Sequence, residues 1–409
     1  QISFYVRKAD NSVIGSTVAS QFAMTANIYR ELTHTVTITQ AMIDDGTIFN
    51  ARLNVGTASF PSGWYCSAMA LYRNNTSTAI QDNSYEDDVL NIFANKPITP
   101  ELVEVPHTHG QYFLRETHQR TQKLKLSEAA QLSIAIIGDS WTQNRDRWSG
   151  VVANQLISQF GDAGGGYTSF AFHPDSLTII NGNIRTSYTF EKSGNWSSAY
   201  AIAANPCASP DISKIWSSTA GDKITCATPA APNVSECNLF YIGTADGVIR
   251  YRFNAGSWAT LNLNSVAVDT LGTANLTGFT VGTQALEIEV VSGTCSLCGV
   301  NWKSNNSGVV VHKLGASGSK AQNWALVNST QFQAGLSVLV PNLVIIMLAT
   351  NDQGATRTTA QFTADMTTLI DRVKTARPLA DVLVVMPCEN NRTNNSTPMV
   401  DYTKSIYEL

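Results

Sequence analysis

The chain has 409 residues, of which 43% are hydrophobic and only 14% are charged. This hydrophobic share supports a sizeable core in two to four domains, and it argues against disorder, which is typical of chains with low hydrophobicity and high net charge. The net charge is −4 and no basic run occurs, so neither a nucleic acid nor an anionic membrane is expected as a partner.

Residues 1–105 consist of short alternating segments separated by turn residues. Polar and apolar residues alternate strictly in 35–39, for example, and Asp45-Gly46 is a turn signal. Period two with frequent turns indicates antiparallel strands, so we predict an N-terminal β-sandwich domain. Residues 106–131 are polar, and we assign them as a connector.

A different pattern begins at Leu132 and extends to residue 185. An apolar run over 132–137 ends in Gly-Asp-Ser, and apolar residues then recur at helical spacing up to Phe160. The alternation of strand and helix returns in 308–409. There we predict strands at 309–311, 343–348 and 382–386 and helices through Trp324 and over 359–375.

Successive strand and helix units of this kind predict a parallel sheet with helices on both faces, so the fold class is α/β. The apolar stretch 343–349 is far shorter than the roughly 20 residues that cross a bilayer, and we expect no membrane insertion.

Residues 186–307 interrupt this domain with strands again. Polar and apolar residues alternate strictly in 249–253 and 286–290, which predicts an inserted β-sandwich. It is a candidate carbohydrate-binding module, because aromatic rings on a β-scaffold can stack on sugars. Its four tryptophans, taken one by one, are nevertheless expected in the core. They are Trp196, Trp216, Trp258 and Trp302.

Three polar segments come directly after predicted parallel strands and should lie at one edge of the sheet. They are 138–140, 315–319 and 350–352. A serine is a nucleophile only when a base removes its proton and donors receive the charge on the attacked carbonyl. Ser140 is the candidate nucleophile. Its backbone amide, a glycine amide in 315–319 and the Asn351 side chain are the candidate donors.

The order of these segments resembles the blocks of the SGNH hydrolases, also called GDSL-like esterases. The matching residues are Gly138-Asp139-Ser140-Trp141, Gly318 and Ala349-Thr350-Asn351-Asp352. The resemblance covers 132–185 and 308–409. It implies a flavodoxin-like α/β/α fold, with Ser140 as nucleophile and an oxyanion hole made by the Ser140 and Gly318 amides and the Asn351 side chain.

Two departures from the family pattern stand out. Ala349 occupies a position where the family has glycine, and no Asp-x-x-His block follows Asn351. In the family that block supplies the general base and the carboxylate that orients it. The chain ends at Leu409 inside a predicted helix, so we infer that it is truncated and that the base lies beyond Leu409.

Other polar residues near these motifs are expected to have structural roles. His312 lies within a predicted strand, and His34, His107 and His109 precede the α/β domain. Asp139 and Asp352 are expected to brace their turns, and Trp141 to pack at the acyl pocket. Cys295-x-x-Cys298 has no second ligand pair at zinc-site spacing, so we expect neither a metal nor a cofactor.

Two β-sandwiches around a small esterase resemble the architecture of phage tailspike and tail-fibre esterases and of secreted polysaccharide deacetylases. The resemblance implies removal of O-acetyl groups from a polysaccharide, a location outside the cell or on a virion, and a homotrimer if the protein is part of a phage fibre. A lipase, thioesterase or arylesterase on the same site is one alternative. A non-catalytic glycan-binding adhesin with a decayed esterase fold is the other.

Overall fold

The computed structural model divides the chain into two compact units, residues 1–99 and 100–409. Unit 1 is described only at three strands. Unit 2 is described over 114–171, 182–199, 207–230, 232–388 and 397–407. None of the helices in these described ranges is long and apolar enough to cross a membrane.

The strands of unit 1 form an antiparallel sheet in the order β2-β1-β3. They are β1 (Ser3–Arg7), β2 (Val13–Val18) and β3 (Ile48–Asn50). The rest of the expected N-terminal sandwich, including the Asp45-Gly46 turn, lies outside the described residues, as do His34, His107 and His109.

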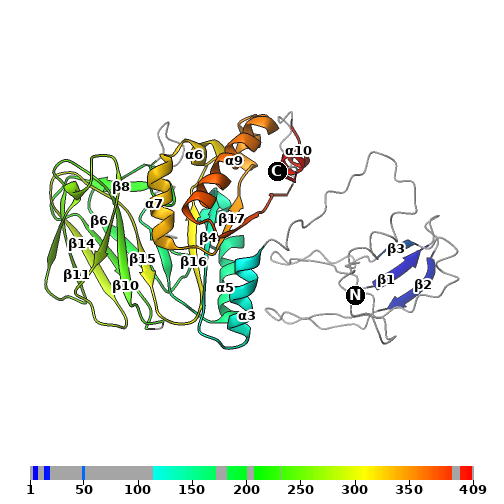
Figure 1. Cartoon of the computed structure of the whole chain (residues 1–409), viewed down its shortest axis with the longest axis horizontal. Coiled ribbons are helices and arrows are strands. Elements are labelled where there is room, and N and C mark those ends of the chain that lie inside the picture. Colours follow the sequence, from blue (N-terminus) through cyan, green and yellow to red (C-terminus); the bar gives the residue numbers. More distant parts are fainter. Residues whose placement is uncertain are drawn as a thin grey trace. The chain divides into compact units, whose positions relative to one another are not determined.

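Unit 2 contains a parallel sheet of four strands in the order β16-β4-β17-β18 (Figure 1). The strands are β4 (Gln131–Gly138), β16 (Gly308–Gly315), β17 (Leu343–Met347) and β18 (Asp381–Val384). In chain order the strands are therefore arranged 2-1-3-4, as in the first four strands of flavodoxin-like sheets. Ligands of such sheets bind outside the carboxyl ends of the strands, where the order reverses, which here is at β4.

Helices cover both faces of this sheet. Successive residues of a strand point to opposite sides, and in a strand such as β4 the apolar side chains on both sides must be covered. In β4, Ile134 and Ile136 face a cluster with α3 and α5, while Ala135 and Ile137 face one with α6, α7, α9 and α10. The helices are α3 (Arg115–Lys125), α4 (Ser140–Gln143), α5 (Trp148–Phe160), α6 (Ala321–Leu326), α7 (Ser329–Leu339), α8 (Thr350–Gly354), α9 (Thr359–Ala376) and α10 (Met399–Tyr407). The sequence prediction of an α/β fold is confirmed.

One segment expected to be a connector is a structural element. Residues 115–125 form α3, and Leu114 and Leu124 at its two ends pack against the sheet. The Thr117 backbone N–H also donates to Asp381 Oδ2 at 2.7 Å. The sequence pattern did not predict this helix, because none of the α3 residues is fully buried and the segment therefore lacks a clear apolar face.

Residues between α5 and β16 form two antiparallel sheets around a common core. One sheet comprises β13 (Leu271–Leu276), β10 (Glu236–Ile242), β15 (Cys295–Lys303), β8 (Lys214–Ser217), β7 (Ser197–Ala199) and β5 (Gly166–Ser169). The other comprises β12 (Ala259–Asn262), β11 (Val248–Phe253), β14 (Ala285–Ser292), β9 (Lys223–Ala227) and β6 (Thr189–Ser193), with the short 3₁₀ helix η2 (Leu263–Ser265) after β12.

The insertion starts earlier than residue 186, where the sequence pattern placed it. Strand β5 already pairs with β15, with Tyr167 opposite Asn301. Its four residues are all buried and show no alternation, so the period-two signal is absent. Among the four tryptophans of 186–307, only Trp302 is fully buried. The core position expected for Trp216 and Trp258 is wrong, since each is half-buried. Trp196 is also half-buried but packs against the core.

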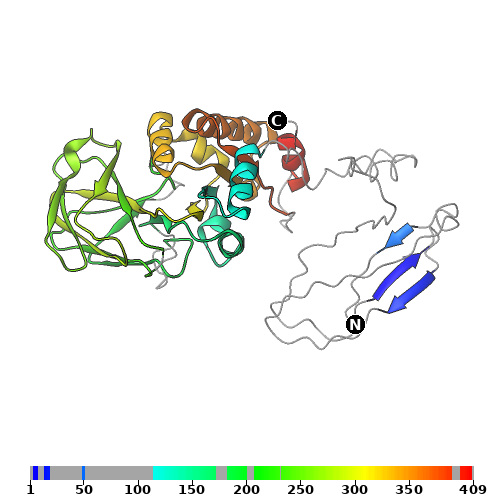
Figure 2. The same ribbon diagram turned by 60° about the horizontal axis from the view of Figure 1, so that its bottom comes forward.

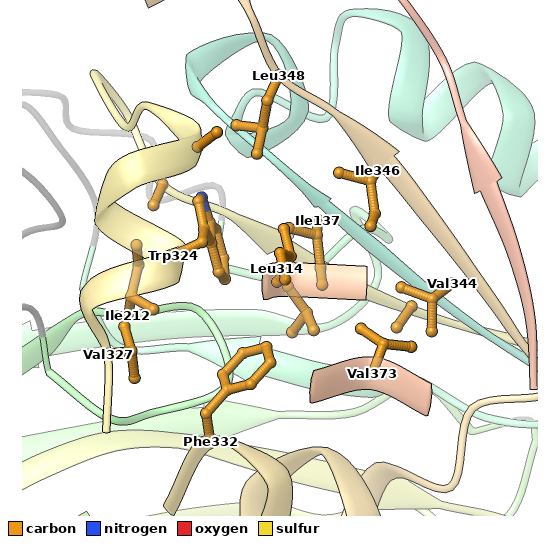
Figure 3. Packing of buried hydrophobic residues seen from close by; sticks show 14 of the residues in the cluster. Ile137, Ile212, Leu314, Trp324, Val327, Phe332, Val344, Ile346, Leu348 and Val373 are labelled. Carbon is orange, nitrogen blue, oxygen red and sulfur yellow. The ribbon is translucent and has the colours of Figure 1, made fainter. Parts of the chain in front are cut away.

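The insertion and the α/β layers share one hydrophobic cluster. Figure 3 shows Ile212 of the insertion beside Trp324, Val327 and Phe332, and all four belong to the cluster that covers one face of the parallel sheet. The backbone N–H of Leu271 also donates to Gln331 on α7 at 2.9 Å. The inserted strands therefore form a lobe that is packed against the α/β layers (Figure 2).

Candidate active site

Ser140 lies at the carboxyl end of the central strand β4, as the first residue of α4. The turn is tight: a Cβ atom on Gly138 would lie 2.1 Å from Thr142 Oγ1 and 2.7 Å from the Met347 carbonyl oxygen, so only glycine fits. Asp139 caps the helix by accepting a hydrogen bond from the Trp141 backbone N–H at 2.9 Å. This turn leaves Ser140 half-buried at the sheet edge.

The loop after β16 is bonded to the end of β4. The Ala316 N–H donates to the Gly138 carbonyl oxygen at 2.8 Å, and Ser319 Oγ donates to the same oxygen at 3.3 Å. Gly318 lies between them with φ +75°, a value that favours glycine. The loop that contains Gly318 is therefore fixed beside the turn that precedes Ser140.

Asn351, in the first turn of α8 after β17, connects the two other segments. Its Nδ2 donates to the Ser319 carbonyl oxygen at 3.0 Å and to Asp139 Oδ2 at 3.2 Å. The structure thus brings all three sequence segments together at one sheet edge. Within the described part of the chain, the backbone amides of Ser140 and Gly318 donate no hydrogen bond, and Ser140 Oγ has no partner.

Two buried carboxyl groups brace this edge, as the sequence predicted. Asp139 is joined to Trp141 and Asn351, and Asp352 accepts a hydrogen bond from the Ala321 N–H at 3.0 Å. Burial is the main cause that raises the pKa of Asp139 to about 6 and that of Asp352 to about 6. Both carboxyl groups therefore change charge near pH 6.

The histidines in the described ranges do not reach Ser140. His312 is buried and pairs with Ala135 within the sheet, three residues before the end of β16. Its Nε2 bonds to Ser133 Oγ at 3.0 Å, and its Nδ1 accepts from the Tyr167 N–H at 3.1 Å. Burial lowers the pKa of His312 to about 3, so this ring is a packed structural group, as expected.

His118, the other described histidine, is exposed on α3. That helix is bonded to the amino ends of strands, because Arg120 donates to the carbonyl oxygen of Gln131 at the start of β4. His118 therefore lies on an element anchored at the opposite edge of the sheet.

Two further side chains lie near Ser140, and the sequence pattern missed the first of them. Lys313 is fully buried and its Nζ donates to the carbonyl oxygen of Gln143, at the end of α4, at 2.7 Å. The sequence signal that could have revealed Lys313 is a lysine within an otherwise apolar strand. Trp141 is 44% exposed, and the Arg147 guanidinium lies 4.0 Å from its ring centroid. In the described residues, no group of three or more histidine, cysteine or carboxylate side chains could hold a metal.

Comparisons with known proteins bear on the fold. No family model and no curated protein matches the sequence. The solved structure of a peptidoglycan O-acetylesterase is similar, with a TM-score of 0.55 and 16% identity over 71% of this chain and 78% of that chain. Residues outside the insertion make up less than two thirds of the chain, so this likeness includes part of the insertion. At that identity it shows a shared α/β fold.

Two further structures match more weakly. A family two carbohydrate esterase from Cellvibrio japonicus matches with a TM-score of 0.20 and 10% identity over 54% of this chain and 84% of that chain. A salicylyl-acyltransferase from a tetracycline biosynthetic pathway matches with a TM-score of 0.23 and 11% identity over 55% and 78% of the two chains. TM-scores this low carry no structural argument.

Proposed function

We propose that the protein is a serine esterase of the SGNH type that removes O-acetyl groups from a polysaccharide. One observation carries the proposal: Asn351 joins the turn before Ser140 to the loop that contains Gly318, at the carboxyl edge of a parallel sheet. The α/β fold shared with a peptidoglycan O-acetylesterase supports it.

In the proposed reaction, Ser140 Oγ attacks the ester carbonyl carbon as a base takes its proton. The oxyanion accepts hydrogen bonds from the amides of Ser140 and Gly318, which have no other acceptor among the described residues. Asn351 Nδ2 becomes a third donor by giving up its longer bond, to Asp139 at 3.2 Å. The alcohol leaves with the proton, and water then hydrolyses the acyl-enzyme to the free acid and Ser140.

The proposal requires a base from outside the described residues. His312 is held by Ser133 and Tyr167 inside the sheet, and His118 lies on α3. A histidine with an orienting carboxylate, both outside the described residues, would complete the site. The proposed substrate is a cell-surface polysaccharide, met outside the cell or at a virion surface. The insertion reaches this edge of the sheet, because the carbonyl oxygens of Asn183 and Arg185 accept hydrogen bonds from Arg145, two positions after α4.

Hydrolysis of p-nitrophenyl acetate by the full-length protein tests the nucleophile. We expect Ser140→Ala to abolish activity and Asn351→Ala to lower kcat about 10²- to 10³-fold, the usual loss for one oxyanion donor. Ser329→Ala, at an exposed serine that begins α7, is the matched control and should leave the rate unchanged. Wild-type activity in the Ser140→Ala protein would reject the proposal.

The length of the acyl group tests the reaction class. An O-acetylesterase should cleave the acetyl ester faster than the octanoyl ester, whereas a lipase or thioesterase should prefer the longer chain. Release of acetate from an O-acetylated polysaccharide, measured for the wild type and the Ser140→Ala protein, then tests the substrate.

A further inference from the structure

A small polar cavity lies beside the helix that begins with Ser140. It has a volume of about 160 Å³, is partly open to solvent, and is lined by the loop between α4 and α5, by α5 itself, and by the loop that precedes β6. Side chains that bear on its chemistry are Arg145, Asp146, Asn154, Arg185, Thr186 and Ser187. This volume is about ten times the roughly 10–15 Å³ that one water molecule needs on the same measure, so a charged group and the carbons next to it fit.

Arg145 is the least compensated charge of the cavity. Its side chain is only 12% exposed, and its Nη1 donates two long hydrogen bonds, to the carbonyl oxygens of Asn183 and Arg185 at 3.3 and 3.4 Å. Its buried Nε has no hydrogen-bond partner among the described residues. The carboxylate of Asp146 lies 3.8 Å away and is 71% exposed. An unpaired buried donor of this kind is costly unless a ligand or water accepts from it.

The remaining residues complete a site for a single negative charge. Arg185 forms an ion pair with Asp162 through one nitrogen of its guanidinium, which has five N–H donors in all. Thr186, Ser187 and Asn154 are exposed and add polar groups at the rim. Asp146 offsets Arg145 only weakly, because its exposed carboxylate lies 3.8 Å from Nε, beyond hydrogen-bond distance. A single carboxylate therefore fits this cavity better than a doubly charged phosphate, which the neighbouring Asp146 would repel more strongly.

We propose that this cavity binds the carboxylate of an acidic sugar in the polysaccharide substrate. One of the two loops that line it follows the proposed nucleophile closely in the chain, since Arg145 comes two positions after the last residue of α4. The other loop is joined to it by the hydrogen bonds from Arg145 to Asn183 and Arg185. An acidic sugar held there would orient the neighbouring, acylated unit toward Ser140. This role rests on the proposed function, whereas binding of the carboxylate itself does not.

Calorimetric titration with methyl glucuronide, methyl glucoside and acetate tests the inference without any ester. We expect the glucuronide to bind at least tenfold more tightly than the neutral glucoside, because only the glucuronide carries the carboxylate. It should also bind at least tenfold more tightly than acetate, because its sugar ring contacts the rim. Equal binding of glucuronide and glucoside would overturn the proposal, and equal binding of glucuronide and acetate would reduce the cavity to a site for free anions.

Variants of Asn154 test the location. Asn154→Asp places a negative charge at the rim on an exposed helix position, so glucuronide affinity should fall at least tenfold while the melting temperature stays the same. Gln159→Glu, which adds the same charge at an exposed position of α5 that does not line the cavity, is the control and should bind like the wild type. Unchanged affinity in Asn154→Asp would show that the glucuronide binds elsewhere.

The two proposals fail separately. If glucuronide binds as expected but Ser140→Ala does not affect ester hydrolysis, the carboxylate site stands and the esterase mechanism fails. If hydrolysis depends on Ser140 but glucuronide binds no better than glucoside, the acidic-sugar site fails alone.

Discussion

At the scale of single residues, Ala349 is the position where the chain departs from the glycine of the resembled family. Its φ of +104° lies in a region that L-residues rarely adopt, and the residue is buried at the end of β17, two positions before Asn351. Such backbone strain costs about 1–3 kcal/mol. The missing glycine is therefore a source of strain next to a proposed oxyanion donor.

We expect Ala349→Gly to raise the free energy of unfolding by about 1 kcal/mol. Relief of strain outweighs the extra entropy that glycine gives the unfolded chain, about 0.4–1 kcal/mol. Urea denaturation measures the change. Ala153→Gly is a matched control in the interior of α5 and should instead lower stability by about 1 kcal/mol. A less stable Ala349→Gly protein would show that the alanine is not strained.

The charge of Asp139 should make stability depend on pH. Burial raises the folded-state pKa of Asp139 from 3.8 to about 6. The folded protein therefore holds this proton more tightly than the unfolded chain does. The resulting stabilisation is complete below about pH 4 and is lost as the pH rises through about 6.

Replacing Asp139 with Asn removes this contribution. From pH 7 to pH 4, the wild type should gain up to about 3 kcal/mol of unfolding free energy relative to Asp139→Asn. Urea midpoints across that range measure the gain. Asp146→Asn, at a side chain that is 71% exposed, should follow the wild type. Parallel pH curves for wild type and Asp139→Asn would contradict the assignment.

The residues of the candidate site could be found from sequence because each follows an apolar strand. Their contacts could not, since Asn351 and Asp139 are 212 positions apart and no local pattern encodes that bond. The cavity next to α4 could not be predicted from the sequence either. Its two arginines, Arg145 and Arg185, are 40 positions apart, and only the fold brings them together.

At the scale of elements, periodicity predicted β4, α5, β17 and α9 because each has an unbroken apolar pattern. The predicted strand at 309–311 was too short, since β16 continues through His312 and Lys313 to Gly315. Buried hydrogen bonds satisfy both polar side chains. Hydropathy alone cannot show that a polar residue within a strand has such a partner.

A buried carboxylate anchors the first strand of the insertion. Asp211 accepts hydrogen bonds from Tyr167 and Ser209 on one oxygen, at 3.1 and 3.0 Å, and from Ser213 and Ser169 on the other. Burial raises the pKa of Asp211 despite these four donors. The network ties β5 to the segment that leads into β8.

We expect Asp211→Ala to lower the free energy of unfolding by about 3 kcal/mol, because the buried hydroxyl groups of Tyr167 and Ser213 lose their acceptor. The hydroxyl groups of Ser169 and Ser209 keep a backbone acceptor each. Tyr167→Phe removes one of those bonds without leaving an unpaired group, and it should cost about 1 kcal/mol. Chemical denaturation compares the two. Equal costs would mean that the hydroxyl groups find other partners.

At the scale of the whole of unit 2, the insertion and the α/β layers behave as one folded body. The cluster that covers one sheet face includes Phe240 and Ile242 of β10 as well as Phe332 of α7 and Val344 of β17. Neither part can open fully without exposing the other's core. The alternating sequence pattern of 186–307 suggested a separate module, and only the structure revealed the common cluster.

Hydrogen exchange followed by mass spectrometry tests this coupling. Phe332→Ala creates a cavity in the shared cluster, at a typical cost of about 3–5 kcal/mol. We expect faster exchange in peptides from β10 and β17 alike. Val281→Ala, at a side chain that is 69% exposed, should change neither. Faster exchange confined to β17 would show that the two parts open independently.

The position of the insertion also bears on the order of folding. Strands β4 and β16 are neighbours in the sheet, with Gln131 paired to Gly308, but the whole insertion lies between them in the chain. If β4 and β16 paired while the insertion was still unfolded, they would close a long loop, and the entropy lost would not be offset by contacts within that loop. We expect the inserted sheets to form first and to draw β4 and β16 together, so the turn that carries Ser140 would be completed late, after most of the chain has left the ribosome.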